Sequence, residues 1–166
     1  MIEIRQEQPT DIPAIREVNR RAFGQDQEGN IVDALRTNRG ILLSLVAVSE
    51  DRIVGHILYS PAVIGAVEGG ALGPMSVLPE FQRRGIGTQL VESGNRKLMA
   101  AGCPYIIVLG HPGFYPRFGF EPANTRGIAC EWEVPDDVFM VLALDRAKVE
   151  GLSGIAKYRQ EFSTVS

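Results

Sequence analysis

The stretch Leu72-Gly73-Pro74-Met75-Ser76-Val77-Leu78-Pro79-Glu80-Phe81-Gln82-Arg83-Arg84-Gly85-Ile86-Gly87 decides the fold. Its first half ends an apolar strand expected over about residues 71–77, where a proline that cannot donate to the ladder predicts a bulge. Its second half opens a helix expected over about residues 85–101, with apolar residues four apart and Gly94 allowing a close approach to the sheet. A continuous apolar run at residues 105–109 predicts a strand covered on both faces. Together these segments predict a βαβ unit.

The turn at residues 82–88 joins the carboxyl end of that strand to the amino end of the helix. Unpaired N–H groups and the helix dipole create an anion site at such a helix start. Gly85 and Gly87 lack a Cβ, so a pyrophosphate can approach the backbone, while Arg83 and Arg84 supply charge from the rim. The turn therefore suits a pyrophosphate.

Two other phosphate-binding patterns fit this turn poorly. The P-loop requires a Gly-Lys-Ser/Thr ending that is absent, and the dinucleotide fingerprint requires a third glycine where Leu90 stands. The hexapeptide alone is explained equally well as a glycine-containing helix start with two solvated arginines. Its context must therefore decide between the two interpretations.

The segments before and after this unit predict a mixed α/β protein. Alternation at Ile2 and Ile4 indicates a short strand, and Thr10-Asp11-Ile12-Pro13 begins a helix that reaches about Phe23. The remaining expectations are a polar loop at 24–30, a shorter helix from about 31 to 40, antiparallel strands at 41–49 and 53–64, turns at 50–52 and 65–70, a strand at about 139–144 and a poorly patterned tail from residue 145.

Composition predicts one folded domain over residues 1–166. The net charge of −3 gives no general reason to bind nucleic acid or an anionic membrane. Cys103 and Cys130 lack the spacing of a disulfide framework or a zinc site, so we expect no metal and thiols that pack as small apolar groups. No run approaches 18 apolar residues, and a cytoplasmic location is the default expectation.

The quoted stretch resembles motif A of the GCN5-related N-acetyltransferases (GNAT family). Tyr115-Pro116-Arg117-Phe118-Gly119-Phe120 resembles the later Tyr-x-x-x-Gly-Phe motif of that family, at a suitable distance after the next strand. The resemblance covers about residues 71–122 and extends to a bacterial branch of predicted N-acetyltransferases with unassigned substrates. It implies a twisted mixed sheet with helices on both faces and acetyl-CoA bound at the central βαβ unit.

The resemblance also implies site residues. Backbone groups of Met75, Ser76 and Val77 would hold the pantetheine arm and the acyl carbonyl. Tyr115 would protonate the leaving thiolate, although this tyrosine is also explained as part of an aromatic core. The N–H groups that would hold the pyrophosphate belong to Gln82, Arg83, Arg84, Gly85, Ile86, Gly87 and Thr88.

The proton acceptor for the amine is left open by the sequence. Where many relatives carry an asparagine, this chain reads Gly110-His111-Pro112, so coenzyme contacts expected there are in doubt. His111, Glu28, Asp26 and water held by backbone carbonyls are the candidates, and His111 is also explained as a surface residue. His56 lies in an apolar strand and is given less weight.

Three functions fit these features. The first is transfer of an acetyl group from acetyl-CoA to a primary amine of a small molecule or peptide by direct attack, with the acceptor pocket at residues 23–29 and 110–114. The second is a non-catalytic acyl-CoA sensor or regulatory module, and the third is a purely structural domain. The acidic chain favours cationic acceptors slightly, and the sequence leaves a homodimer open.

Overall fold

Alternation of apolar residues along the first strands gives the sheet two buried faces. In the computed structural model, which describes residues 1–163, Leu45 and Ala47 pack in one cluster while Val46 between them packs in another. The strands are β1 (Ile2–Gln6), β2 (Leu43–Ser49), β3 (Arg52–Ile64), β4 (Val67–Val77), β5 (Tyr105–Leu109), β6 (Glu121–Pro122), β7 (Ile128–Cys130), β8 (Phe139–Ala143) and β9 (Gly154–Lys157).

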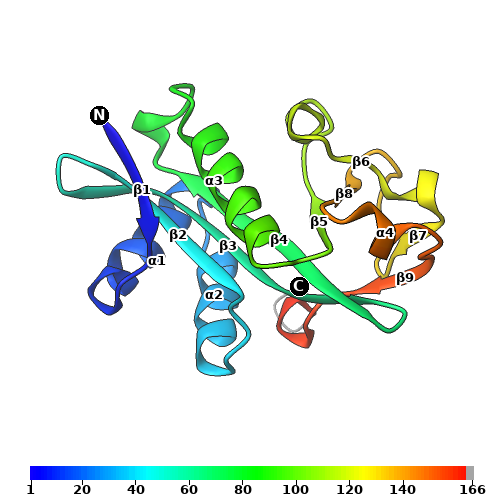
Figure 1. Cartoon of the computed structure of the whole chain (residues 1–166). Coiled ribbons are helices and arrows are strands. Elements are labelled where there is room, and N and C mark those ends of the chain that lie inside the picture. Colours follow the sequence, from blue (N-terminus) through cyan, green and yellow to red (C-terminus); the bar gives the residue numbers. More distant parts are fainter. Residues whose placement is uncertain (164–166) are drawn as a thin grey trace.

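Helices cover both faces of this sheet (Figure 1). Helix α3 contacts β2, β3 and β4 on one face, and α1 contacts β3 and β4 on the other. Gly94 of α3 lies against the Tyr59 ring, and a Cβ there would collide with it, so the expected close approach of this helix is confirmed. The helices are α1 (Ile12–Phe23), α2 (Gln27–Thr37), α3 (Ile86–Ala100) and α4 (Arg146–Val149).

The strand order is β1-β2-β3-β4-β5-β8-β6, with β9 pairing both β3 and β7. Strands β1 to β4 are antiparallel neighbours, β4 and β5 run parallel, and α3 connects them, so the predicted βαβ unit and mixed α/β class are confirmed. The parallel pairing covers only Gly70 to Leu72 of β4. Beyond Leu72 the two strands diverge, and the candidate site lies in the space between them.

Two expected boundaries are wrong, each for a local reason. Strand β4 begins at Val67 inside the stretch expected to be a turn, because Gly69 accepts the Tyr105 ring, which would lie 2.5 Å from a Cβ at that position. Helix α2 begins at Gln27 rather than after residue 30, and Gly29 leaves room there for the Arg16 side chain. Glu28, expected in a loop, is therefore in the first turn of a helix.

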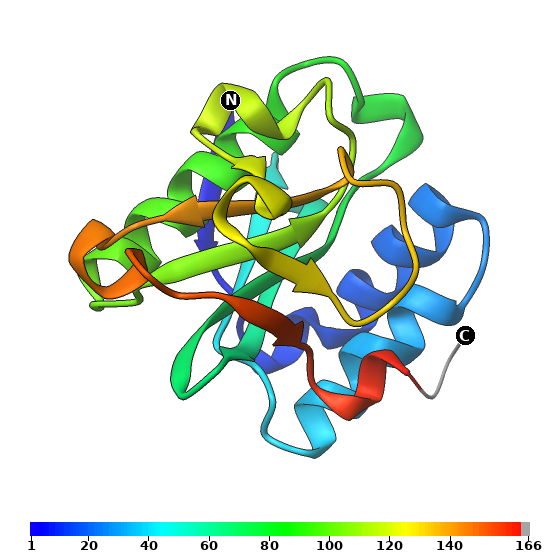
Figure 2. The same ribbon diagram turned by 90° about the vertical axis from the view of Figure 1, so that its right-hand side faces the viewer.

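The C-terminal segment, expected to be poorly patterned, is part of the sheet. Strand β9 pairs Ala156 and Lys157 with the end of β3, and a 3-10 helix at Gln160–Phe162 follows it. Figure 2 shows this segment beside α2, with the chain after β7 passing in front of the sheet. Within residues 1–163, no helix is long and apolar enough to cross a bilayer.

Candidate active site

Strand β4 presents an unpaired edge where it separates from β5. The ladder between β3 and β4 shifts register at Gly73 and Pro74, which are joined by a cis peptide bond, so the predicted irregularity at this proline is confirmed. The Leu78 N–H donates to Val54 of β3 at 2.9 Å. Because peptide groups alternate along a strand, the backbone groups of Met75 and Val77 point away from β3 into the space left by β5.

The turn before α3 has the backbone geometry of an anion cradle. Arg83 has φ of 65° and Gly85 φ of 80°, and such left-handed residues alternating with others form concave N–H nests. The first hydrogen bond across the helix start runs from the Gln89 N–H to the Gly85 carbonyl at 3.1 Å. The N–H groups of residues 86–88 precede that bond and are available to a ligand.

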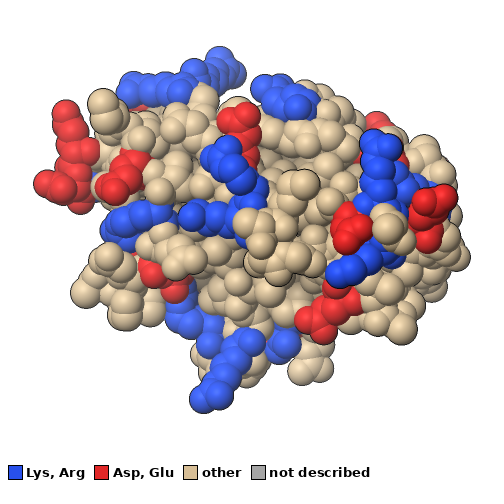
Figure 3. All heavy atoms as spheres, in the orientation of Figure 1, with Lys and Arg blue, Asp and Glu red and all other residues tan. Residues whose placement is uncertain are grey.

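Side chains hold this turn and add positive charge to it. The Gln82 Nε2 donates to the Val77 carbonyl at 3.0 Å, which ties the turn back to β4. The Arg84 guanidinium lies 5.2 Å from the centre of the Phe81 ring. Figure 3 shows Lys and Arg side chains along the upper edge of the face in view, over the turn that precedes α3. The acidic chain thus carries local positive charge at the candidate pyrophosphate site.

Tyr115 is one of the residues that line the cavity described below. A Cβ at Gly110 would collide with its ring, so the glycine of the Gly110-His111-Pro112 departure makes room for the phenol. Phe114 and Phe120 contact the ring edge to face at 5.0 and 5.6 Å, which shows that Tyr115 is also part of an aromatic cluster. Its hydroxyl has no hydrogen-bond partner among residues 1–163, and burial raises the pKa of Tyr115 to about 12. The phenol therefore stays protonated at neutral pH.

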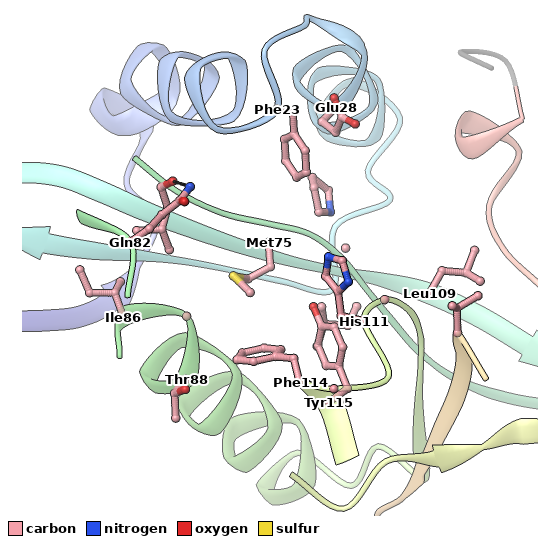
Figure 4. Close-up of a pocket in the computed structure, with 18 of the residues that line it drawn as sticks. Phe23, Glu28, Met75, Gln82, Ile86, Thr88, Leu109, His111, Phe114 and Tyr115 are labelled. Atoms are coloured by element: carbon pink, nitrogen blue, oxygen red, sulfur yellow. Dashed lines mark hydrogen bonds between the residues drawn. The ribbon is translucent and has the colours of Figure 1, made fainter. Parts of the chain in front are cut away.

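One cavity of about 1270 Å³ joins these features. Its volume exceeds the roughly 300–1,000 Å³ of a usual small-ligand site, so it has room for a donor and an acceptor. Figure 4 shows Phe23 and Glu28 on the side of α1 and α2, and His111 and Tyr115 on the opposite side. The predicted residues that line the cavity are Met75, Val77, Gln82, Arg83, Gly85, Ile86, Gly87, Thr88 and Tyr115.

Ser76 and Arg84 are the two predicted coenzyme-contacting residues that do not line this cavity. The Ser76 hydroxyl donates to the Asn19 Oδ1 at 3.0 Å on the face covered by α1, where it is buried. Ser76 alternates with Met75 and Val77, and its peptide group belongs to the ladder with β3. A coenzyme role for its backbone remains a prediction that the geometry does not favour.

The candidate proton acceptors are separated by the structure. Asp26 is not among the cavity residues and lies 3.8 Å from the Arg16 guanidinium. Glu28 and His111 both line the cavity, and Figure 4 places them on opposite sides of it, with His111 beside Tyr115. His56 is fully buried, contacts Asn19 and Ser44, and has its pKa lowered to about 3 by burial. It is therefore a neutral core residue.

The two thiols lie outside the cavity. Cys103 and Cys130 are half-buried and free, and burial raises the pKa of each thiol. A raised pKa disfavours the thiolate that a covalent acyl carrier requires. Residues 1–163 contain no cluster of three or more His, Cys, Asp or Glu side chains that could hold a metal ion.

Sequence reasoning missed one wall of the cavity. The loops expected to form the acceptor pocket, at 23–29 and 110–114, do contribute lining residues. The missed wall consists of Trp132, Val134, Val138, Tyr158 and Phe162. These side chains come from irregular chain and short elements without a hydrophobic period, so only the aromatic character of Trp132, Tyr158 and Phe162 was available as a signal.

The chain is similar to known acetyltransferases. The model of the acetyltransferase (GNAT) domain matches residues 41–122. The uncharacterized N-acetyltransferase YhbS of Escherichia coli is 31% identical over 163 residues, covering 96% of this chain and 98% of that protein.

Two solved structures share the fold over almost the whole chain. The structure of YhbS in complex with CoA has a TM-score of 0.95 at 30% identity and covers 99% of this chain and 93% of that chain. A GNAT family acetyltransferase from Brucella melitensis in complex with acetyl-CoA has a TM-score of 0.83 at 36% identity, covering 98% of both chains. The fold and the site define an acetyltransferase. Within that class, the chain belongs to the GNAT family, and the family predicted from the sequence is confirmed.

Proposed function

We propose that this protein transfers the acetyl group of acetyl-CoA to a primary amine by direct attack of the amine on the thioester. The observation that carries the proposal is the single cavity that joins an N–H-lined helix start, an unpaired strand edge and the Tyr115 hydroxyl. The CoA-bound and acetyl-CoA-bound structures of the two similar proteins support the donor.

The described residues fit the donor along its length. Its pyrophosphate would accept hydrogen bonds from the N–H groups of residues 83–88, with Arg83 and Arg84 at the rim. Its amide-bearing arm would pair with the backbone groups of Met75 and with the Val77 N–H, as an added strand pairs with a sheet edge, while the Val77 carbonyl accepts from Gln82. The backbone N–H groups of this β4 edge would also stabilise the oxyanion that develops on the thioester carbonyl.

The acceptor amine must lose a proton before it attacks. With a lysine-like pKa of about 10.4, freeing the lone pair at pH 7 costs about 4 to 5 kcal/mol. We assign proton acceptance to His111, because it lies beside Tyr115 at the cavity wall and is exposed to solvent that can carry the proton away. A new C–N bond then forms as the C–S bond breaks.

Tyr115 would stabilise the departing sulfur. Its pKa of about 12 exceeds the reference value of about 8.5 for a thiol, so complete transfer of its proton to the thiolate is uphill by about 5 kcal/mol. We therefore assign to the phenol a hydrogen bond to the developing thiolate, with the proton finally supplied through solvent. This role requires the protonated phenol, which burial favours.

Two measurements test the proposal. Acetyl-CoA should raise the melting temperature, and a panel of primary amines should cause release of free coenzyme A thiol together with an equal amount of acetylated amine. Binding without thiol release for any amine would favour the non-catalytic sensor. Trapping of an acetyl group on Cys103 or Cys130 during turnover would refute direct transfer.

A further inference from the structure

The cavity extends well beyond the part assigned to the donor. Its second half, here called the acceptor half, is lined by residues of α1 and α2 and by residues of the chain from Trp132 onward. Its main side chains are Phe23, Glu28, Ile31, Trp132, Tyr158 and Phe162. All six lie outside residues 41–122, the part that the family model matches. The acceptor half is therefore the part of the site that the family model does not cover.

Aromatic rings form one continuous wall of the acceptor half. The Trp132 and Tyr158 rings lie 4.9 Å apart, and the Tyr158 and Phe162 rings lie 5.3 Å apart. Phe23 faces the same cavity and is 40% exposed, so its ring is open to a ligand there. These surfaces suit an apolar or aromatic body and can also contact an ammonium group through their ring faces.

The charged side chains that line the cavity differ in sign between its two halves. Among the described lining residues, those with a charged side chain of the Asp, Glu, Lys or Arg type are Glu28, Arg83 and Arg117. Arg83 belongs to the turn before α3, and Arg117 lies 4.8 Å from the Phe114 ring and donates to the Phe114 carbonyl at 2.9 Å. The Phe114 ring lies beside Gly87 of α3, so both cations belong to the donor half.

Glu28 gives the acceptor half a negative charge. Both of its carboxylate oxygens accept from the Gln25 amide, at 3.2 and 3.1 Å, and it forms no ion pair within residues 1–163. It lies across the cavity from His111 and Tyr115, so it can attract a cationic acceptor without accepting the proton of the reacting amine (Figure 4). The same charge repels an acceptor that carries a carboxylate.

We propose that the acceptor is an amine on an aromatic or apolar body that has no carboxylate beside the amine, such as an arylalkylamine. This inference rests on the proposed acetyl transfer and adds its substrate class. Free amino acids are disfavoured because the described residues of the acceptor half include no Lys or Arg for their carboxylate. Polyamines and aminoglycosides are disfavoured because one carboxylate and an aromatic wall leave most of their charges and hydroxyls unpaired.

The first experiment compares three amines that share a phenyl ring. With saturating acetyl-CoA, 2-phenylethylamine and L-phenylalaninamide should each give kcat/KM at least tenfold above that of L-phenylalanine. L-Phenylalaninamide has nearly the size of the amino acid but no negative charge, so it separates charge from bulk. Equal or better use of L-phenylalanine, or of spermidine added as a fourth acceptor, would overturn the proposed class.

The second experiment tests whether Glu28 sets this preference. In Glu28→Gln the ratio of kcat/KM for L-phenylalaninamide to that for L-phenylalanine should fall at least threefold, mainly through KM. In Asp26→Asn, which removes the same charge from the chain just before α2 but outside the cavity lining, the ratio should be unchanged. Comparing ratios cancels the different basicities of the amines. An unchanged ratio in Glu28→Gln contradicts the role of this carboxylate.

The third experiment measures acceptor binding without turnover. Trp132 is the only tryptophan of the chain, so its fluorescence reports directly on the aromatic wall. In the complex with CoA, 2-phenylethylamine should change this emission saturably at concentrations where L-phenylalanine has little effect, and Trp132→Phe should lose the signal. The reverse order of the two ligands would overturn the proposal.

The outcomes separate this inference from the proposed function. A protein that binds acetyl-CoA and acetylates other amines but neither binds nor acetylates the aromatic amines contradicts the substrate class alone. A protein that does not bind acetyl-CoA contradicts the proposed function itself.

Discussion

At the scale of single residues, the Tyr115 hydroxyl is the group that connects fold and chemistry. We expect Tyr115→Phe to lower kcat by about 10- to 100-fold while the KM for acetyl-CoA stays nearly unchanged, because the lost hydrogen bond forms mainly as sulfur becomes charged. The ring contacts with Phe114 and Phe120 survive this substitution, so the fold should be retained. Steady-state kinetics and the melting-temperature shift with CoA provide the two readouts, and unchanged kcat removes Tyr115 from the mechanism.

The role assigned to His111 leads to a prediction about pH dependence. If it accepts the amine proton, His111→Gln should lower kcat by about 10- to 100-fold, and the loss should shrink as the pH rises and more of the amine is already neutral. Because His111 is exposed, the substitution should leave the melting temperature almost unchanged. A loss of the same size at every pH, up to the pKa of the acceptor amine, would contradict this assignment.

At the scale of elements, the end of β5 positions Tyr115 through the space that Gly110 leaves. Gly110→Ala should displace the phenol, lower kcat and destabilise the protein by roughly 1 to 3 kcal/mol through overpacking. Kinetics and urea unfolding measure the two effects. If the alanine acts through the phenol, adding it to Tyr115→Phe should lower kcat much less than adding it to the wild-type chain. Additive losses would show that Gly110 has another role.

The elements that the sequence predicted well have strong local signals. The spacing of apolar residues predicted α3, and the apolar run at residues 105–109 predicted both ends of β5 correctly. The start of β4 was missed because Gly69 and Gly70 are typical of a turn. The Tyr105 ring, which requires a glycine at position 69, belongs to a strand more than 30 residues away. A local pattern cannot report a contact of that kind.

The same limit divides the candidate site. The donor half is contained in consecutive residues around the turn at 82–88, so its chemistry could be inferred from one motif. The acceptor half combines Phe23 with Trp132 and Tyr158, and only the folded chain brings these residues together. The sequence could therefore predict what the enzyme donates, and the structure was needed to infer what it accepts.

At the scale of the whole molecule, the acceptor half depends on how the C-terminal segment is held against α2. Glu161 is buried there, bonded by Arg159 at 2.9 Å and by Asn38 of the chain after α2 at 2.9 Å. Arg159 first and then Asn38 hold the pKa of Glu161 at about 2, well below its ordinary value of about 4.3. A carboxyl with a depressed folded-state pKa stabilises the protein above about pH 4.3, and this stabilisation is lost as the pH falls toward 2.

Glu161→Gln should therefore lower the free energy of unfolding at pH 7 by roughly 1 to 3 kcal/mol and flatten its fall between about pH 4.3 and 2. Urea unfolding at pH 7 and pH 3 measures both effects. Glu17→Gln is the matched control, because its partner Arg20 lies at a similar distance, 2.7 Å, but the pair is exposed on α1 and should contribute little. Since Tyr158 and Phe162 flank Glu161, the variant should also raise the KM for the acceptor more than that for acetyl-CoA. An equal rise in both KM values would mean that this segment supports the whole cavity rather than its acceptor half.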